Sequence, residues 1–418
     1  MPIRGLFSVL TVLPLLLAGS GAGNAGPTDW PRFHGPARDN RSTETGLLKA
    51  CPPEGPRLLW TARGLGHGFA TVAVSGGRIY TSGDREGKTV ISALDLDGRM
   101  IWQQDNGPAW EGSVPGSRGT PTLDGDRLYH ENAHGDVACL DAKTGAKRWS
   151  VNILAAFGGQ NINWGLSESV LIDGDRVICC PGGPETAVAA LDKHTGRTAW
   201  RSGSAGDLAG YASPTLGEHR GLRMIFTLTS RAAIGVNADT GELLWRFEHV
   251  TPFDETITMP IYHDGCVLIS TRTAGTVLLA LDVDGRRCAV REVWRAKALD
   301  NQHGGLVLHE GHVYGASHVN SGGKWICVEW KTGEVKYVER GVGKGSITYA
   351  DGMLYTLSEN RVLGLVEASP NQHRLVSRFQ IPAGGEGPSW AHPVVCGGRL
   401  YVRHGDLLYA YDVDAKPR

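Results

Sequence analysis

Short apolar stretches alternate with polar, glycine-containing turns along almost the whole chain. A typical unit is residues 120–129, in which two runs of alternating apolar and polar residues flank the pair Asp124 and Gly125. Alternation with a period of two predicts half-buried β-strands, and Asp-Gly between such runs indicates a hairpin. Turn glycines of this kind recur at Gly76, Gly125, Gly174, Gly221, Gly265, Gly311, Gly352 and Gly397. The pattern predicts an all-β protein with almost no helix after residue 30.

A second motif recurs at the same spacing. It consists of a small residue, a hydrophobic residue and an acid, then a Thr-Gly or Asp-Gly turn, then an aromatic residue, as in Cys139-Leu140-Asp141 followed by Gly145 and Trp149. The aromatic positions of successive units are Trp60, Trp102, Trp149, Trp200, Trp245, Trp294, Tyr337 and Phe379. Seven intervals of about 46 residues separate the first from the last, which is the period of a propeller blade. Two hairpins per unit and eight units predict an eight-bladed β-propeller with four antiparallel strands per blade.

Two half-units at the ends of the repeat region show how the ring would close. The strand from Arg57 to Trp60 has no inner neighbour, and the strand from Leu407 to Val413 has no outer one. Pairing them in one blade removes two free edges, which would otherwise favour aggregation. An open β-solenoid is the alternative, but it leaves both half-units unexplained. We also expect each aromatic residue to bridge the gap between neighbouring sheets, where a large ring buries much apolar surface.

The first 25 residues predict a targeting signal rather than part of the fold. Arg4 precedes an apolar run from Leu6 to Leu17, and small residues follow, with cleavage expected after Ala22 or Ala25. Ser20 stands where a lipoprotein would carry its acylated cysteine, so we expect no lipid anchor, and no stretch is long enough to span a membrane. The expected organisation is 1–25 signal peptide, 26–56 N-terminal extension and 57–418 propeller, in a periplasmic or secreted protein.

The composition narrows the classes of partner. Glycine is abundant, with 58 residues in 418, which suits a protein of many tight turns. The formal net charge is −1, and this balance argues against a nucleic-acid binder, which would show a basic excess. We therefore expect no nucleic-acid partner, and an envelope protein or a glycan is the partner class left open.

The repeat resembles a known family. The unit of acid, Thr-Gly turn and Trp resembles the tryptophan-docking repeat of quinoprotein alcohol dehydrogenases and other PQQ-binding-like β-propellers, and Asp29-Trp30-Pro31 with Gly35 resembles the opening found before the first blade in that group. The resemblance extends over residues 29–413. Stretches such as Gly343-Lys344-Gly345-Ser346 and Trp390-Ala391-His392-Pro393 are most similar to exported propellers of unassigned function common in planctomycete-type bacteria.

Candidate binding residues lie in the segments that precede each blade's inner strand. Loops on a rigid scaffold commonly carry binding sites. These segments contain His67, Arg118, Asn163, Trp164, Glu168, Tyr211, His303, Lys344, Trp390 and His392. Cations, imidazoles and indoles that converge on one channel mouth could hold an anionic, planar or sugar-like ligand. The alternative is that they only fill and hydrate the channel.

From this set we predict seven ligand-binding residues, with catalytic residues unknown and no metal site: Arg118, Trp164, Glu168, His303, Lys344, Trp390 and His392.

The adjacent pair Cys179 and Cys180 matches one feature of the quinoprotein dehydrogenases, which carry a disulfide between neighbouring cysteines. Here the pair follows a middle strand, a different context, and a bridge between neighbours needs a strained ring. Two ordinary thiols on opposite faces of a strand are the favoured interpretation. The other six cysteines suggest no disulfide framework, because Cys139 and Cys327 occupy equivalent positions four blades apart.

Two hypotheses of different class follow. The favoured one is a ligand- or partner-binding scaffold in the cell envelope, similar in fold to the barrel-assembly propeller of the outer membrane. The alternative is a PQQ- and calcium-dependent alcohol or polyvinyl-alcohol dehydrogenase, which the family resemblance implies would need a calcium ion, a catalytic Asp and a Trp beneath the quinone. Glu168, Asn163 and Trp164 or Trp390 supply the right residue types, but no inner-strand Asp matches the catalytic position, and Asp300 is only a nearby candidate.

Overall fold

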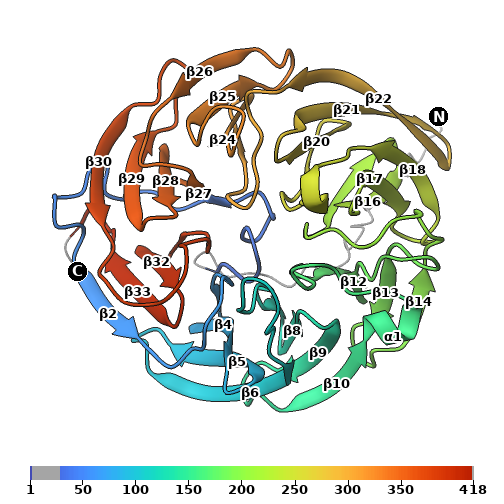
Figure 1. Ribbon diagram of the computed structural model, residues 1–418, viewed down its shortest axis with the longest axis horizontal. Helices are drawn as coiled ribbons and strands as arrows, with labels where there is room; N and C mark the ends of the chain where they lie inside the picture. The colour runs from blue at the N-terminus through green and yellow to red at the C-terminus, as the bar shows by residue number, and fades with distance from the viewer. Residues whose placement is uncertain (2–28, 417–418) are drawn as a thin grey trace.

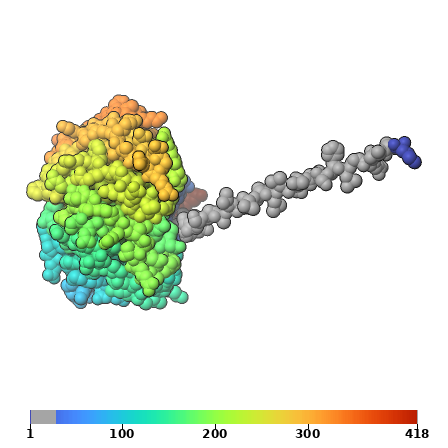
Figure 2. All heavy atoms as spheres, turned by 90° about the vertical axis from the view of Figure 1, so that its right-hand side faces the viewer, coloured from blue at the N-terminus to red at the C-terminus, as the bar shows by residue number. Residues whose placement is uncertain are grey.

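Eight β-sheets are arranged around a central axis, with the outermost strand of each sheet on the rim (Figure 1). The computed structural model describes residues 29–416 together with Met1. Seen from the rim, the body is a thick disc (Figure 2). The eight-bladed prediction is confirmed, and Met1 and residues 29–416 contain one short α-helix, α1 (Ile153–Phe157), and one 3₁₀ turn, η1 (Pro252–Asp254).

Blades 1 to 4 follow one another along the chain. Blade 1 contains β3 (Ala73–Ser75), β4 (Arg78–Arg85), β5 (Lys88–Asp95) and β6 (Met100–Pro108). Blade 2 contains β7 (Thr122–Asp124), β8 (Arg127–Glu131), β9 (Asp136–Asp141) and β10 (Lys147–Asn152). Blade 3 contains β11 (Leu171–Asp173), β12 (Arg176–Cys179), β13 (Ala189–Asp192) and β14 (Thr198–Arg201). Blade 4 contains β15 (Thr215–His219), β16 (Leu222–Leu228), β17 (Ala232–Asn237) and β18 (Leu243–Glu248).

Blades 5 to 8 complete the ring. Blade 5 contains β19 (Ile261–His263), β20 (Cys266–Thr271), β21 (Gly275–Asp284) and β22 (Arg287–Ala296). Blade 6 contains β23 (Val307–His309), β24 (His312–Ala316), β25 (Trp325–Glu329) and β26 (Val335–Glu339). Blade 7 contains β27 (Gly345–Ala350), β28 (Met353–Ser358), β29 (Val362–Glu367) and β30 (Leu375–Gln380), with β1 (Arg41–Ser42) added beside β27. Blade 8 contains β31 (Val394–Cys396), β32 (Arg399–His404), β33 (Leu407–Asp412) and β2 (Leu58–Ala62).

The N-terminal and C-terminal strands pair in one blade, as the two half-units in the sequence led us to predict. Strand β2 pairs antiparallel with β33, with Trp60 opposite Ala410, so the N-terminal strand is the outer strand of blade 8. All eight predicted turn glycines lie between the first and second strands of their blades, with φ between 57° and 78°. An L-residue is disfavoured at these angles, which explains why glycine recurs there.

The repeated tryptophans hold neighbouring blades together. The indole of Trp149 packs against Gly196 in the outer turn of blade 3, and its Nε1 donates to the carbonyl of Lys193 at 3.0 Å. Trp294 of blade 5 makes the same two contacts with blade 6, with Gly333 and with the carbonyl of Trp330 at 2.8 Å. The expectation that the aromatic residues bridge adjacent sheets is confirmed.

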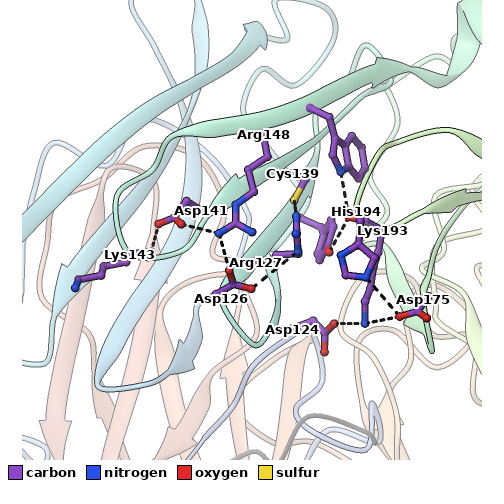
Figure 3. Close-up of polar contacts among 12 residues, drawn as sticks. Asp124, Asp126, Arg127, Cys139, Asp141, Lys143, Arg148, Asp175, Lys193 and His194 are labelled. Carbon is purple, nitrogen blue, oxygen red and sulfur yellow. Dashed lines mark hydrogen bonds and ion pairs between the residues drawn. The ribbon is translucent and has the colours of Figure 1, made fainter. Parts of the chain in front are cut away.

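Ion pairs reinforce the same seam on the turn side of the disc (Figure 3). Lys193 of blade 3 places its Nζ 3.0 Å from Asp124 of blade 2 and 3.1 Å from Asp175 of its own blade. Arg148 joins Asp126 and Asp141 within blade 2 at 2.6 Å each. These ion pairs stabilise the blades and the contact between them, and they lie on the side of the disc that carries the Asp-Gly and Thr-Gly turns.

Residues 29–42, which we call the axial plug, cross the middle of the ring (Figure 1). The plug exchanges backbone hydrogen bonds between Trp30 and Val74 of blade 1, and β1 runs parallel to β27 of blade 7. Between these ends, Arg38 is buried and donates to the carbonyls of Ser169 and Val170 in blade 3. The sequence indicated an N-terminal extension here but not that it crosses the middle of the ring.

The predicted targeting segment falls on residues 1–25, which except for Met1 lie outside the described residues. Among the residues that the structure describes, no helix has the length and apolar character needed to cross a membrane.

Candidate functional site

A cavity of about 290 Å³ lies at the axis, on the side of the disc opposite the Asp-Gly and Thr-Gly turns. We call it the axial cup. Its wall comes from the lead-in segments, the stretches that immediately precede the inner strand of each blade. Seven of the eight blades contribute, through Phe69, Arg118, Trp164, Tyr211, Glu255, His303 and Trp390, for blades 1 to 6 and 8 in order. Phe33 and His34 of the axial plug also line it. The cup is therefore a feature of the closed ring rather than of any single blade.

Hydroxyl groups fix the lead-in segments relative to one another. The backbone N–H of Thr71 donates to Oγ1 of Thr120, that of Thr120 to Oγ of Ser169, and that of Ser169 to Oγ of Ser213, at 2.8 to 3.1 Å. Each bond joins one blade to the next, so blades 1 to 4 are linked around the axis. A Ser or Thr two positions before each of these inner strands is the periodic signal in the sequence that could have indicated this chain of bonds.

Two groups of aromatic rings line the cup. Trp390 packs against Phe69, with ring centroids 4.8 Å apart, and against His303 at 5.3 Å. In the other group, Trp164 lies 5.7 Å from Tyr211. Because aromatic faces bind flat or apolar groups well, these rings give the cup a preference for such ligands.

Arg118 is the cationic group of the cup wall. Its guanidinium donates to the carbonyls of Gly116 at 2.8 Å and Val114 at 2.6 Å, and lies 5.4 Å from the centre of the Phe69 ring. Burial lowers the pKa of Arg118 to about 10, partly offset by the charge of Asp84. The side chain stays protonated at neutral pH, and an anion in the cup would be attracted to it.

Histidines close the floor of the cup in their neutral form. Nε2 of His392 donates to the carbonyl of His303 at 2.8 Å, since a carbonyl can only accept. Nδ1 of His392 therefore accepts from Nε2 of His34 of the plug, at 3.1 Å. Burial lowers the pKa of His392 to about 4 and lowers that of His34 well below its usual value. At neutral pH these rings contribute polarity but no charge.

Glu255 places a carboxylate in the lining of the cup, but the charge of this carboxylate is neutralised by Arg272. Arg272 donates to both of its oxygens at 2.9 Å, and Gln302 donates to Oε2 at 2.9 Å. Both contacts come from Nη1 of Arg272, and hydrogen bonds between oppositely charged groups are shorter and stronger than neutral ones. The sequence did not point to Glu255, because its role depends on a partner from another loop of the same blade.

Five of the seven predicted binding residues line the cup, and two do not. Arg118, Trp164, His303, Trp390 and His392 lie in the wall or floor, and Tyr211 of the wider candidate set joins them. Two further candidates, His67 and Asn163, are absent from the lining, and Asn163 is exposed.

Lys344 belongs to the one lead-in segment that does not reach the cup. Its Nζ pairs with Glu359 at 3.2 Å and contacts Nδ1 of His318 at 2.9 Å. Glu359 also accepts from the indole N–H of Trp390 at 2.8 Å, so it positions a wall residue. Nothing in the local sequence around Glu359 indicated this role, because the contact joins blade 7 to the lead-in of blade 8.

Glu168 lies behind the cup rather than in it. It is buried beside Glu131, and its Oε1 accepts from the backbone N–H of Cys180 at 2.8 Å. Burial raises the pKa of Glu168, and burial together with the neighbouring Glu168 raises that of Glu131 well above its usual value. This geometry points to a structural acid pair between blades 2 and 3.

Cys179 and Cys180 are unbridged thiols. Cys179 packs in the core between blades 2 and 3, and Cys180 packs in the core between blades 3 and 4. Successive strand residues point to opposite faces of a sheet, which separates the two sulfur atoms. The favoured interpretation of this pair agrees with the structure.

Comparison with known proteins places the chain in a family. The family model described as outer membrane protein assembly factor BamB matches residues 87–339, more than half of the chain. The protein therefore belongs to this family of PQQ-like propellers.

The solved structures that it resembles include BamB and alcohol dehydrogenases. BamB from Moraxella catarrhalis has a TM-score of 0.63 at 18% identity and covers 86% of this chain and 98% of its own. Quinohemoprotein alcohol dehydrogenase from Comamonas testosteroni has a TM-score of 0.66 at 14% identity, and the match covers 94% of this chain and 81% of that enzyme. At these identities the likeness establishes the fold alone.

One curated relative matches in sequence, a quinohemoprotein alcohol dehydrogenase of Pseudomonas putida. The identity is 32% over 142 residues, which are 32% of this chain and 19% of that enzyme. The chain thus spans about a fifth of the length of the curated relative that it matches.

The residues around the cup do not fit PQQ with calcium. Glu255 is the acidic residue of the lining, and Arg272 holds both of its oxygens, while Glu168 is turned away towards Cys180. No group of three or more His, Cys, Asp or Glu residues within the described part of the chain is arranged to hold a metal ion.

Asp300, the candidate catalytic acid, is fully buried and saturated with hydrogen bonds. Its carboxylate accepts from four backbone N–H groups and one hydroxyl, those of Thr273, His318, Val319, Asn320 and Ser317. A carboxylate with this many donors anchors loops and is not available as a base. We derive no catalytic step through a quinone.

Proposed function

We propose that this protein is a binding propeller of the cell envelope that captures a small molecule, or a protruding group of a larger partner, in the axial cup. The observation that supports this most directly is the cup itself. Seven blades and the axial plug build one aromatic-walled cavity with a single arginine facing it. Concave, mostly apolar cavities with a few placed polar groups are the usual form of a ligand site.

An exposed aromatic side chain connected to the cup wall offers a surface for a larger partner. Phe253 is 72% exposed and has φ of 61°, a conformation unfavourable for a bulky residue. Arg272 holds its ring at 6.0 Å and also binds Glu255 of the cup, so the exposed ring is connected to the cup wall. The similarity to BamB, named as an outer membrane protein assembly factor, supports a protein partner for such a surface.

The dehydrogenase alternative receives less support. The folds of the quinohemoprotein enzymes are similar, but the carboxylates that the reaction would need are engaged in Glu255–Arg272 and in the Asp300 loop anchor.

A binding panel tests the proposed function. Purified protein is titrated by calorimetry with aromatic acids, neutral aromatics, mono- and disaccharides, and PQQ with Ca²⁺. We expect saturable binding of at least one class, and its loss in Ser167→Phe, whose ring would fill the cup from a partly exposed lining position. Val335→Phe on the exposed rim strand β26 is the matched control.

Two results would contradict the proposal. One is that no class binds, or that Ser167→Phe binds as the wild type does while folding normally. The other is dye-linked oxidation of alcohols that appears only with PQQ and Ca²⁺, which would favour the dehydrogenase.

A further inference from the structure

Among the described residues that line the axial cup, Arg118 is the one cation without a carboxylate partner. Arg38, which donates to the lining residues Ser169 and Met259, also has no carboxylate of the described chain in an ion pair with it but is not itself part of the lining. Arg118 is positive, and its guanidinium is bonded to two backbone carbonyls rather than to a carboxylate. The negative charge of Glu255 is neutralised by Arg272. The positive charge of Lys344, just outside the cup, is neutralised by Glu359. The carboxylate whose charge acts on Arg118 is that of Asp84, which accepts hydrogen bonds from the hydroxyl of Thr89 and the backbone N–H of Trp110.

The guanidinium keeps donors for a ligand. It has five N–H groups, and the contacts with Gly116 and Val114 use one on each of the two terminal nitrogens. The fork of an arginine matches the two oxygens of a carboxylate, and such a pair gains strength where water is excluded. The group that best completes this site is one carboxylate.

The aromatic groups define the rest of the ligand. Trp390 with Phe69 and Trp164 with Tyr211 present ring faces within one cavity of about 290 Å³. That volume is at the lower end for small-molecule sites, so it suits one or two fused rings rather than a large cofactor. A ligand with several carboxylates would bring negative charges for which the cup has one cation, and burying an unpaired charge is costly.

Resting on the proposed function, we propose that the axial cup selects a flat aromatic monocarboxylate, or an aromatic group with one carboxylate on a larger molecule. Its carboxylate pairs with Arg118, and its ring lies among Phe69, Trp390, Trp164 and Tyr211. Specificity then comes from a single charge in an otherwise neutral aromatic cup.

The test uses a pair of probes that differ only in charge. Indole-3-acetate and its neutral amide, indole-3-acetamide, are titrated into the full protein by calorimetry. We expect the wild type to bind the acid at least tenfold more tightly than the amide. In Arg118→Gln the ratio of the affinity for the acid to that for the amide falls to about one, while the amide binds as before. Arg118→Lys retains part of the preference for the acid, because lysine keeps the charge but not the two-pronged guanidinium.

Arg287→Gln serves as the matched control, because Arg287 is exposed at the start of the rim strand β22. We expect it to leave the preference for the acid unchanged. Circular dichroism and unfolding midpoints establish that each variant is folded.

The inference is overturned if the wild type binds both probes equally, if it binds neither, or if Arg118→Gln retains the preference. Failure of the proposed function is a separate result. If another class in the panel, such as a saccharide, binds in the cup and Ser167→Phe abolishes that binding, the binding propeller stands and only the aromatic monocarboxylate is rejected.

Discussion

Phe379, on the outer strand of blade 7, packs directly against Gly55, a residue of the N-terminal segment about three quarters of the chain length away. A Cβ built on Gly55 would lie 2.6 Å from Cδ2 of Phe379. Gly333 makes the equivalent contact with Trp294, so Gly55 takes the place of the turn glycine that the last blade lacks. The closing blade is thus docked by the same device as the others.

This contact predicts that Gly55→Ala weakens the closure of the ring. The new methyl group would overlap the Phe379 ring, and φ is 93°, which disfavours any L-residue. Gly46→Ala is the matched control, since Gly46 has φ of 77° but no atom within 4 Å. We expect a loss of about 1 kcal/mol for the control and about 1–3 kcal/mol more for Gly55→Ala, measured by urea unfolding. Equal losses would show that the Phe379 contact contributes nothing.

Asp300→Asn should destabilise the protein rather than affect a reaction. The substitution replaces one carboxylate oxygen with an NH₂ group that faces N–H donors, in a side chain that is fully buried. We expect a loss of about 2–4 kcal/mol in the free energy of unfolding. The exposed Asp282→Asn should change it by less than about 0.5 kcal/mol. A variant at position 300 with wild-type stability would contradict the anchoring role.

His373 makes stability depend on pH. Burial against Trp325 and Tyr337 lowers its pKa from 6.5 to about 4. The unfolded chain therefore binds more protons between these values, so the contribution of His373 to stability is complete above pH 6.5 and is lost as the pH falls towards 4.

We expect His373→Phe, which keeps the ring packing, to reduce the loss of stability over this window by up to about 3 kcal/mol. Unfolding free energies at pH 7, 5.5 and 4 measure the difference. Parallel pH curves for the variant and the wild type would contradict the assignment.

Export is the fourth prediction, and it rests on sequence alone. Cleavage after Ala22 or Ala25 gives a mature protein that begins at Gly23 or Gly26 without an acyl group, because Ser20 replaces the lipoprotein cysteine. Intact-mass measurement of the envelope fraction tests both points. Leu13→Arg should abolish export by breaking the apolar run, whereas Leu13→Ile should not. A mature chain that retains Met1, or carries lipid, would contradict the prediction.

The fold was predictable because its signals are local and repeated. An Asp-Gly turn such as Asp124–Gly125 needs a glycine at positive φ whatever surrounds it, and an alternating run needs one buried face. Repetition then supplies the blade number. Even the closure of the ring followed, since β2 and β33 each carry half of a pattern that is complete elsewhere.

The candidate site was predictable in position but only partly in composition. Five of the seven selected residues line the cup because the lead-in segments of seven of the eight blades converge on it. Glu168 was misplaced because the local sequence does not reveal that its carboxylate turns to the backbone of Cys180. Glu255 and Glu359 were missed because their roles depend on Arg272 and Trp390, partners supplied by other loops.

By itself, the sequence of this protein determined an eight-bladed propeller, the residues of its turns and the docking aromatics, because each is marked by a short local pattern that repeats in every blade. Only the tertiary structure decided that the axial plug crosses the middle of the ring, that Arg272 and Glu359 neutralise nearby charges, and that Arg118 is the cation among the described residues lining the cup. Ion pairs between residues far apart in sequence depend on which loops lie next to one another at the axis. The closed ring decides which loops are neighbours, and no single stretch of the chain contains that information.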